Sequence, residues 1–309
     1  MAPPALLRPD VLVLAAGGIV GEAWMNGVLA GIEDGGGADF RRVEAYVGTS
    51  AGSIVAARLA AGRPLRRPDS LDEDAAWSAP EAGELDAGGG VRGLVREVTR
   101  VGWAVSAPFT GAAVTATAPA GALARAAILG RAAGHGRSLH QLHERVARWG
   151  ARFDGRLRVC AVDRRSGRRT VFGAPGAPAA TVADAVCASS AIPWVFAPVR
   201  IGEREYVDGG AWSVTNLDAA QTGRDTHVLC LDPAASVGGQ DRRTAALRGA
   251  FRIASELEIQ RLRRRGAHVL HLAPDRSAVA AMGTSFMAPD RVTGALAAGY
   301  AQGQRLALA

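Results

Sequence analysis

Lysine is absent from this sequence of 309 residues, so all 36 basic side chains are arginines. The formal net charge of +7 would favour anionic partners. The arginines are scattered, however, and their densest cluster, Arg261 to Arg265, ends a segment with a helical pattern. We interpret this cluster as the cationic end of a helix that faces water, and we expect no nucleic-acid partner.

Cysteine is scarce, and neither the cysteines nor the clustered histidines have the spacing of a metal-binding motif. The sequence has three cysteines, Cys160, Cys187 and Cys230. They lie far apart, which predicts reduced thiols in a cytoplasmic protein. Three histidines lie closer together, His135, His140 and His143. No carboxylate or thiol accompanies them in a recognisable spacing, so we predict no metal site.

Long apolar segments suited to a membrane are also missing. The longest uncharged stretch, Val101 to Ala124, is rich in small residues and contains two prolines, so it is a poor membrane span. The stretch VLVLAAGGIVGEA, which starts at Val11, superficially resembles a signal peptide. Asp10 borders it and a glycine loop interrupts it, so we predict a buried strand there instead.

Strand-like and helix-like segments alternate at both ends of the chain. We expect strands at 11–16, 44–48, 157–163, 168–174, 204–208, 226–233 and 267–275, and helices at 22–33, 50–61, 181–190, 242–265 and 290–306. This alternation predicts an α/β fold, a three-layer sandwich with a largely parallel central sheet. No repeat or linker is visible, so residues 1–309 are expected to form a single domain, with 63–150 as a helical cap or insertion.

One short motif places a serine between two glycines. Gly48-Thr49-Ser50-Ala51-Gly52 lies where an apolar strand gives way to a helical pattern. A nucleophile on such a turn is thrust out at the end of the sheet, and the start of the new helix stabilises developing negative charge. Ser50 could equally serve as the N-cap of its helix, so the motif alone leaves both readings open.

Two further glycine motifs bear on the same question. Ala15 to Trp24, AAGGIVGEAW, is a strand followed by a glycine turn and a helix, which offers backbone amides to an anion. Tyr206 to Gly210, YVDGG, places Asp208 at a strand end, although Asp-Gly is also a common β-turn pair.

Together these three motifs resemble the patatin-like phospholipase family. The resemblance extends to Ala188–Val199, ASSAIPWVFAPV, and to Thr215-Asn216 after the Asp-Gly-Gly turn. It covers residues 10–62 and 155–220, with the C-terminal helix compatible.

The resemblance implies a patatin-like fold and a lipid acyl hydrolase without a cofactor. Ser50 would attack an ester carbonyl, and Asp208 would be its general base. The amides of Gly17, Gly18 and Ala51 would form the oxyanion hole. The motif glycines are Gly21, Gly48, Gly52, Gly209 and Gly210. Hydrolysis and acyl transfer share the same acyl-serine, so both stay open.

Two positions depart from the family pattern. Ala16 replaces a glycine, and Val20 replaces a cation, which puts the usual phospholipid preference in doubt. We therefore expect acyl-lipid substrates recognised mainly by their chains, with activity that rises with chain length. Trp103 and Phe109 are expected in an acyl-binding wall or a lipid-facing lid that contacts the membrane peripherally.

Other classes of protein remain as alternatives. An α/β-hydrolase would pair Ser50 with a late histidine, and three are available, His227, His268 and His271. That fold builds several strands before its nucleophile, whereas one strand–helix unit precedes Ser50 here. A nucleotide-binding protein would need an acidic residue that ends a second strand, and Asp39 precedes that strand. A protein that binds acyl chains without turnover is the third alternative.

Overall fold

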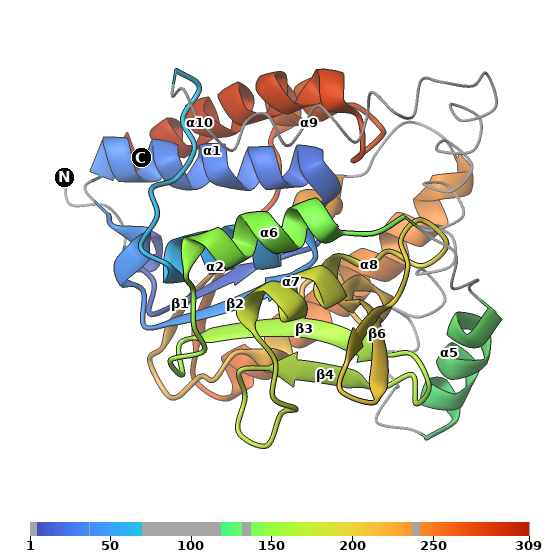
Figure 1. Ribbon diagram of the computed structural model, residues 1–309. Coiled ribbons are helices and arrows are strands. Elements are labelled where there is room, and N and C mark those ends of the chain that lie inside the picture. Colours follow the sequence, from blue (N-terminus) through green and yellow to red (C-terminus); the bar gives the residue numbers. More distant parts are fainter. Residues whose placement is uncertain (1–4, 37, 70–118, 132–136, 237–241, 309) are drawn as a thin grey trace.

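The computed structural model describes residues 5–36, 38–69, 119–131, 137–236 and 242–308 (Figure 1). Eight strands form one sheet in the order β5-β6-β3-β2-β1-β7-β8, with β4 beside β3. The strands are β1 Val11–Leu14, β2 Ala45–Thr49, β3 Leu157–Asp163, β4 Arg169–Phe172, β5 Val199–Ile201, β6 Arg204–Asp208, β7 His227–Leu231 and β8 His268–Leu272. The run β3-β2-β1-β7-β8 is parallel, and β4, β5 and β6 pair antiparallel.

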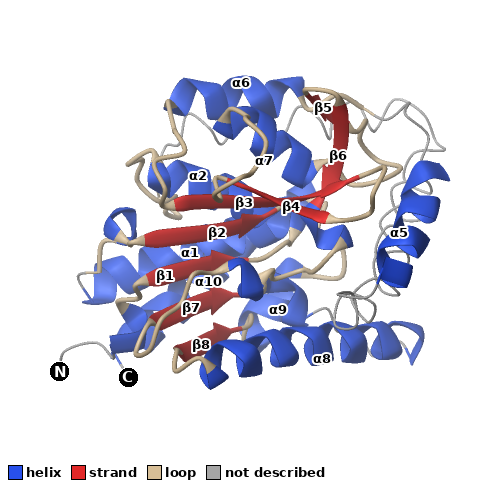
Figure 2. Cartoon of the chain, turned by 90° about the horizontal axis from the view of Figure 1, so that it is seen from below, coloured by secondary structure: helices blue, strands red, loops and turns tan. Residues whose placement is uncertain are grey.

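Helices cover both faces of this sheet (Figure 2). They are α1 Gly18–Gly36, α2 Ala51–Ala60, α5 Pro119–Arg131, α6 His140–Trp149, α7 Val182–Ser190, α8 Arg242–Arg264, α9 Arg276–Met282 and α10 Val292–Leu308. Side chains of β1 alternate between the two faces, as the period of a strand requires. Leu12 and Leu14 join the core under α1, α2, α7 and α10. Val11 and Val13 join a second core with Ile259 of α8, so the predicted three-layer α/β fold is confirmed.

β6 takes over from β2 along one edge of β3, and this exchange brings two distant segments together. Cys160 of β3 pairs with Thr49 of β2, whereas the next residue, Ala161, pairs with Asp208 of β6. β4 pairs with both Cys160 and Ala161, so it occupies the opposite edge of β3. The last residues of β2 and β6 therefore lie against consecutive residues of one strand.

Helices α1 and α10 pack with their backbones in close contact, because glycines line their interface. A Cβ on Gly31 would lie 2.1 Å from the carbonyl oxygen of Tyr300. A Cβ on Gly303 would lie 2.2 Å from the carbonyl oxygen of Val28. This contact fixes the C-terminal helix over the helix that follows β1.

Most predicted elements are confirmed, with differences at their ends. Helix α1 begins at Gly18, four residues before the predicted start at Glu22, because the glycine turn itself enters the helix. Strand β5 and helix α9, which are only three and seven residues long, were not among the predicted elements. The arginines at the end of α8 are exposed around the buried Leu262, as predicted.

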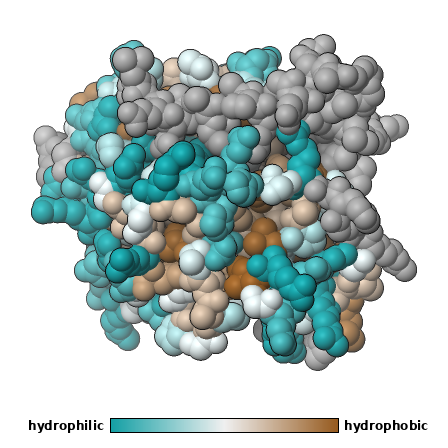
Figure 3. Space-filling view, in the orientation of Figure 1, coloured by the Kyte–Doolittle hydropathy of each residue, from teal (hydrophilic) through white to brown (hydrophobic). Residues whose placement is uncertain are grey.

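Several predictions concern residues outside the described part of the chain. Trp103, Phe109 and His135 lie there, together with most of the uncharged stretch. Helices α5 and α6 belong to the predicted insertion 63–150, which stays a prediction, as does the single domain. No helix among the described residues combines the length and the apolar character that crossing a membrane requires. Hydrophilic and hydrophobic residues alternate over the described surface in the view of Figure 3.

Candidate active site

The serine turn is as sharp as its sequence predicts. Ser50 joins β2 to α2 with φ 52° and ψ −123°, a conformation that a non-glycine residue rarely adopts. A Cβ on Gly48 would lie 2.5 Å from the Cα of Ser53, and one on Gly52 would lie 2.0 Å from the carbonyl oxygen of Leu14. The flanking glycines are therefore required by the close approach of α2 to β2 and β1.

Hydrogen bonds hold the backbone of Ser50 in this conformation. Its amide donates to Oγ of Ser189 at 2.8 Å, and that hydroxyl donates to the carbonyl oxygen of Cys160 at 2.6 Å. The carbonyl oxygen of Ser50 accepts from the amide and the hydroxyl of Ser53 at 2.8 and 2.6 Å. The Ser50 side chain makes no capping hydrogen bond to the N-terminus of α2, although Ser50 occupies the N-cap position.

Asp208 ends β6 and lies beside Ser50, although 157 residues separate them in sequence, because β6 continues the edge of β3 that β2 begins. Its carboxyl group is buried, with 6% of the residue exposed. Burial raises the pKa of Asp208 to about 6, while hydrogen bonds from the Ser50 side chain and the Gly210 amide act in the opposite direction. The Gly210 amide donates to Oδ1 of Asp208 at 2.7 Å.

The glycine turn after β1 and the start of α2 present unpaired amides. Within the described part of the chain, the amides of Gly17, Gly18 and Ala51 donate no hydrogen bond to another protein group. Gly18 has φ 58°, and a Cβ there would lie 2.6 Å from the carbonyl oxygen of Phe286. Gly17 and Gly21 pack closely on the ring of Pro233, which explains both glycines.

A small cavity of about 50 Å³ opens beside Ser50, and Gly18 and Ala51 also line it. Much of its wall is apolar, with Ile54, Leu142, Ile192 and Phe196 among the lining residues. Such a wall suits an acyl group.

Two other polar side chains line the same cavity. They are Ser190 and Glu22, and both are buried. The Glu22 carboxylate lies 4.0 Å from Nη1 of Arg145, which is also buried and stacks over the ring of Trp149. A buried ion pair therefore lies behind one wall of the cavity.

The two departures from the family pattern occupy apolar surroundings. Ala16 is buried with Ala15, Val214 and Ala234. Val20 is fully buried in the main core under α1. The position where the family carries a cation thus holds an aliphatic core residue.

The late histidines lie away from Ser50. His227 and His268 begin β7 and β8, at the amino ends of these parallel strands, whereas Ser50 follows the carboxyl end of β2. His271 lies in β8, three strands from β2 in the sheet, and bonds to Asp232 at 3.1 Å. The structure therefore does not bring a histidine of this set to Ser50.

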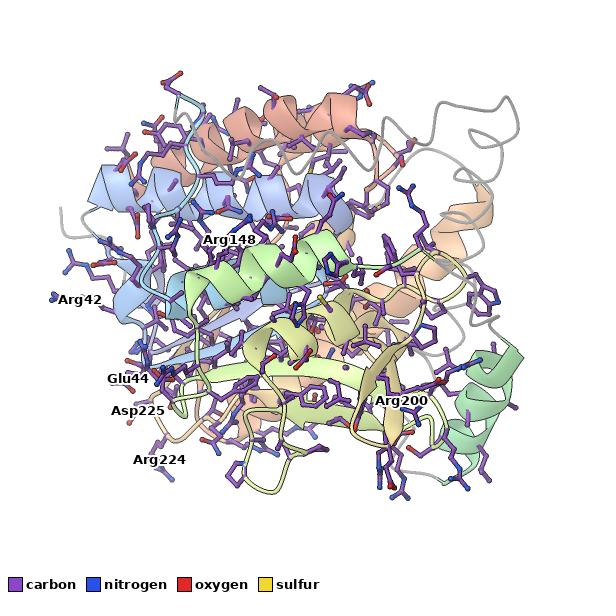
Figure 4. All side chains as sticks on the ribbon, viewed as in Figure 1. Arg42, Glu44, Arg148, Arg200, Arg224 and Asp225 are labelled. Atoms are coloured by element: carbon purple, nitrogen blue, oxygen red, sulfur yellow. The ribbon has the colours of Figure 1, made fainter. Side chains whose placement is uncertain are left out.

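The amino ends of the strands border a larger cavity of about 340 Å³. Asp10, Glu44, Arg224 and Asp225 line it, and Figure 4 shows the last three at one edge of the molecule. None of the three glycine motifs contributes a residue to this cavity, so its larger size alone does not indicate a catalytic site.

Some residues of the site were not predicted as functional. Ser189, Ser190 and Ile192 belong to the stretch ASSAIPWVFAPV, which the family resemblance includes without assigning roles. Glu22 carries no local signal, because a single acidic residue in a helix usually faces water. Among the described residues, no cluster of His, Cys, Asp and Glu could hold a metal ion.

Comparisons with known proteins agree with the sequence motifs. The family model described as patatin-like phospholipase matches residues 12–220. A comparison with curated proteins found no match. Among solved structures, the chain is similar to the crystal structure of VipD from Legionella pneumophila, with 15% identity and a TM-score of 0.46, covering 97% of this chain and 67% of that chain. Since the family model spans more than half of its length, the chain belongs to the patatin-like phospholipase family.

Proposed function

We propose that the protein is a lipid acyl hydrolase that cleaves carboxylic esters through an acyl-serine on a Ser50–Asp208 dyad. The observation that carries this proposal is the strained Ser50 turn beside a buried carboxylate whose pKa is raised to about 6. An aspartate with its ordinary pKa is a weak base, whereas a pKa close to the working pH suits proton transfer. At neutral pH Asp208 is still mostly ionised and can accept a proton.

In the first half of the reaction, the Oγ of Ser50 attacks the ester carbonyl carbon while Asp208 takes the hydroxyl proton. The carbonyl oxygen becomes an oxyanion, to which the amides of Gly17, Gly18 and Ala51 donate. The tetrahedral intermediate then collapses, and Asp208 returns the proton to the departing alcohol. An acyl-serine remains.

In the second half, water attacks the acyl-serine and Asp208 takes one of its protons. Collapse of the second intermediate breaks the acyl–Ser50 bond, and the proton returns to Oγ. The fatty acid leaves and the dyad is restored. The substrate is an acyl lipid whose chain enters the apolar cavity beside Ser50.

Labelling with a fluorophosphonate probe tests the proposal, because this reagent modifies activated serines. We expect the probe on the peptide that contains Ser50, and Ser50→Ala should abolish both labelling and ester turnover. Ser190→Ala is the matched control, since it makes the same change at another buried serine of the same cavity. A folded Ser50→Ala protein that turns over esters at the normal rate would end the serine-hydrolase proposal.

A further inference from the structure

Asn216, which follows the Asp-Gly-Gly turn, is fully buried and uses every part of its side-chain amide. Nδ2 donates to Oγ1 of Thr49 at 3.0 Å and to the carbonyl oxygen of Ser213 at 2.6 Å. It also lies 3.4 Å from the carbonyl oxygen of Gly209. Oδ1 accepts from Nη1 of Arg169 at 3.0 Å. Since a guanidinium only donates and carbonyl oxygens only accept, the orientation of the amide is fixed.

Two of the four partners of this amide are immediate sequence neighbours of the proposed dyad. Thr49 precedes Ser50, and Gly209 follows Asp208. We propose that Asn216 is a positioning residue that holds the two turns together and so sets the geometry of the Ser50–Asp208 pair. The inference rests on the proposed function, and Asn216 itself touches neither substrate nor reacting atoms.

The backbone around Asn216 is anchored on both sides. Thr215 donates its hydroxyl to Oε2 of Glu258 at 2.6 Å, and the amide of Leu217 donates to the same oxygen at 2.8 Å. Asn216 has φ 50°, a left-handed conformation that asparagine tolerates better than most residues. A buried carboxylate of α8 thus fixes the segment from which the amide reaches the two turns.

The turn at Gly209 also affects the pKa of Asp208, the proposed base. The next amide, that of Gly210, donates to Asp208 and stabilises its charged form. Without the Asn216 side chain, this turn is less constrained and the hydrogen bond weakens. The pKa of Asp208 then rises, so the fraction of ionised base at a given acidic pH falls.

The first test is Asn216→Ala, with steady-state kinetics on a soluble short-chain ester. We expect kcat to fall by about 10- to 100-fold, the effect of a misplaced catalytic group. KM should change by less than about threefold, because no substrate contact is lost. The acidic limb of the pH–rate profile should move to higher pH, and fluorophosphonate labelling should slow in parallel with kcat.

Asn26→Ala is the matched control. Asn26 is also buried, and its amide bridges backbone groups, donating to the Glu22 carbonyl oxygen at 3.0 Å and accepting from the Arg66 amide at 3.3 Å. Its loss should destabilise the fold in a similar way. We expect kcat per folded molecule and the acidic limb to stay as in the wild type.

If Asn216→Ala does not fold, Thr49→Val decides, because it removes one acceptor of the amide and keeps the β-branched shape. We expect a several-fold lower kcat, an unchanged KM and an acidic limb at higher pH. A folded Asn216→Ala or Thr49→Val variant with wild-type kcat and an unmoved limb would overturn the inference. A wild-type protein that neither labels nor turns over esters would instead refute the proposed function. NMR titration of the Asp208 carboxyl carbon still tests the inference in that case, because Asn216→Ala should raise this pKa.

Discussion

The parallel strands of the central sheet end in two regions, which we call the carboxyl edge and the amino edge after the ends of the strands that lie there. Polar side chains are buried at the first and exposed at the second. At the carboxyl edge, where β2 ends, Ser50 and Asp208 are buried and held by hydrogen bonds. At the amino edge, His268 pairs with Asp225 at 3.7 Å while 57% and 80% of their side chains stay exposed. The cavity at the amino edge is several times larger. Burial and strain, and not cavity size, therefore distinguish the edge that suits catalysis.

Replacing Asp208, the proposed base at the carboxyl edge, should give the largest effect on turnover. Asp208→Asn keeps the shape of the side chain and removes its ability to accept a proton. We expect the chemical step to slow by at least about 100-fold, the usual contribution of a general base. Steady-state and single-turnover kinetics on an activated ester measure this loss.

His271→Ala is the control for that change, since His271 is the late histidine with a buried carboxylate partner, Asp232. We expect its turnover to stay within about twofold of the wild type. Normal rates in Asp208→Asn together with an inactive His271→Ala protein would favour the α/β-hydrolase alternative.

The pH dependence of turnover is the second way to sharpen the comparison. Asp208 must be ionised to act as a base, and its pKa is raised to about 6 by burial. Turnover should therefore be constant above this value and fall about tenfold per pH unit below it. An acidic limb near the ordinary carboxyl pKa of 3.8 would contradict the burial of Asp208.

The burial of Asp208 also makes the stability of the protein depend on pH. Turnover should rise as Asp208 ionises, whereas the free energy of unfolding should fall. A raised pKa means that the folded state binds the proton more tightly than the unfolded chain does. The contribution of Asp208 to the free energy of unfolding is full below its ordinary pKa of 3.8 and is lost as pH rises through about 6. Asp208→Asn cannot ionise, so its stability relative to the wild type should increase by on the order of 3 kcal/mol between pH 3.5 and 7.5.

Urea unfolding of both proteins at the two pH values measures this difference. If Asp208→Asn is inactive but more stable than the wild type at neutral pH, the ionised Asp208 lowers the free energy of unfolding of the wild type. A relative stability that does not change with pH would mean that Asp208 is solvated in the folded protein.

The turns that carry the proposed dyad could be predicted from the sequence because their motifs are local. The glycines around Ser50 and after Asp208 are needed by backbone contacts within a few ångströms, and such needs leave a pattern in consecutive residues. The exchange of β2 for β6 along β3 leaves no such pattern, because it depends on pairing between distant strands. Glu22 and Ser189 were missed for the same reason, since only the folded chain brings them to the cavity or the turn.

The helix pair α1–α10 supplies a smaller test, in which one substitution is made at two places on one helix. Gly303→Ala would place a Cβ 2.2 Å from a carbonyl oxygen of α1, so the backbones must separate. We expect a loss of about 1–3 kcal/mol in the free energy of unfolding, as for other overpacked interiors. Gly294→Ala has its nearest neighbour at 3.9 Å on an exposed part of α10, and it should gain up to about 1 kcal/mol. Equal effects at both positions would contradict the close packing of α1 and α10.

The smallest effect is expected at the amino edge. His268→Ala removes the exposed pair with Asp225 and the stacking on His227, whose ring centroid lies 5.3 Å away. Exposed pairs contribute little because solvent and side-chain entropy offset them, so the stability should change by less than about 1 kcal/mol. Turnover should stay within about twofold of the wild type, because no group of the proposed dyad is touched. Kinetics and urea unfolding of this variant check both values. A tenfold loss of turnover in a folded His268→Ala protein would mean that the two edges are coupled during the reaction, and the contrast between them would no longer identify the active edge.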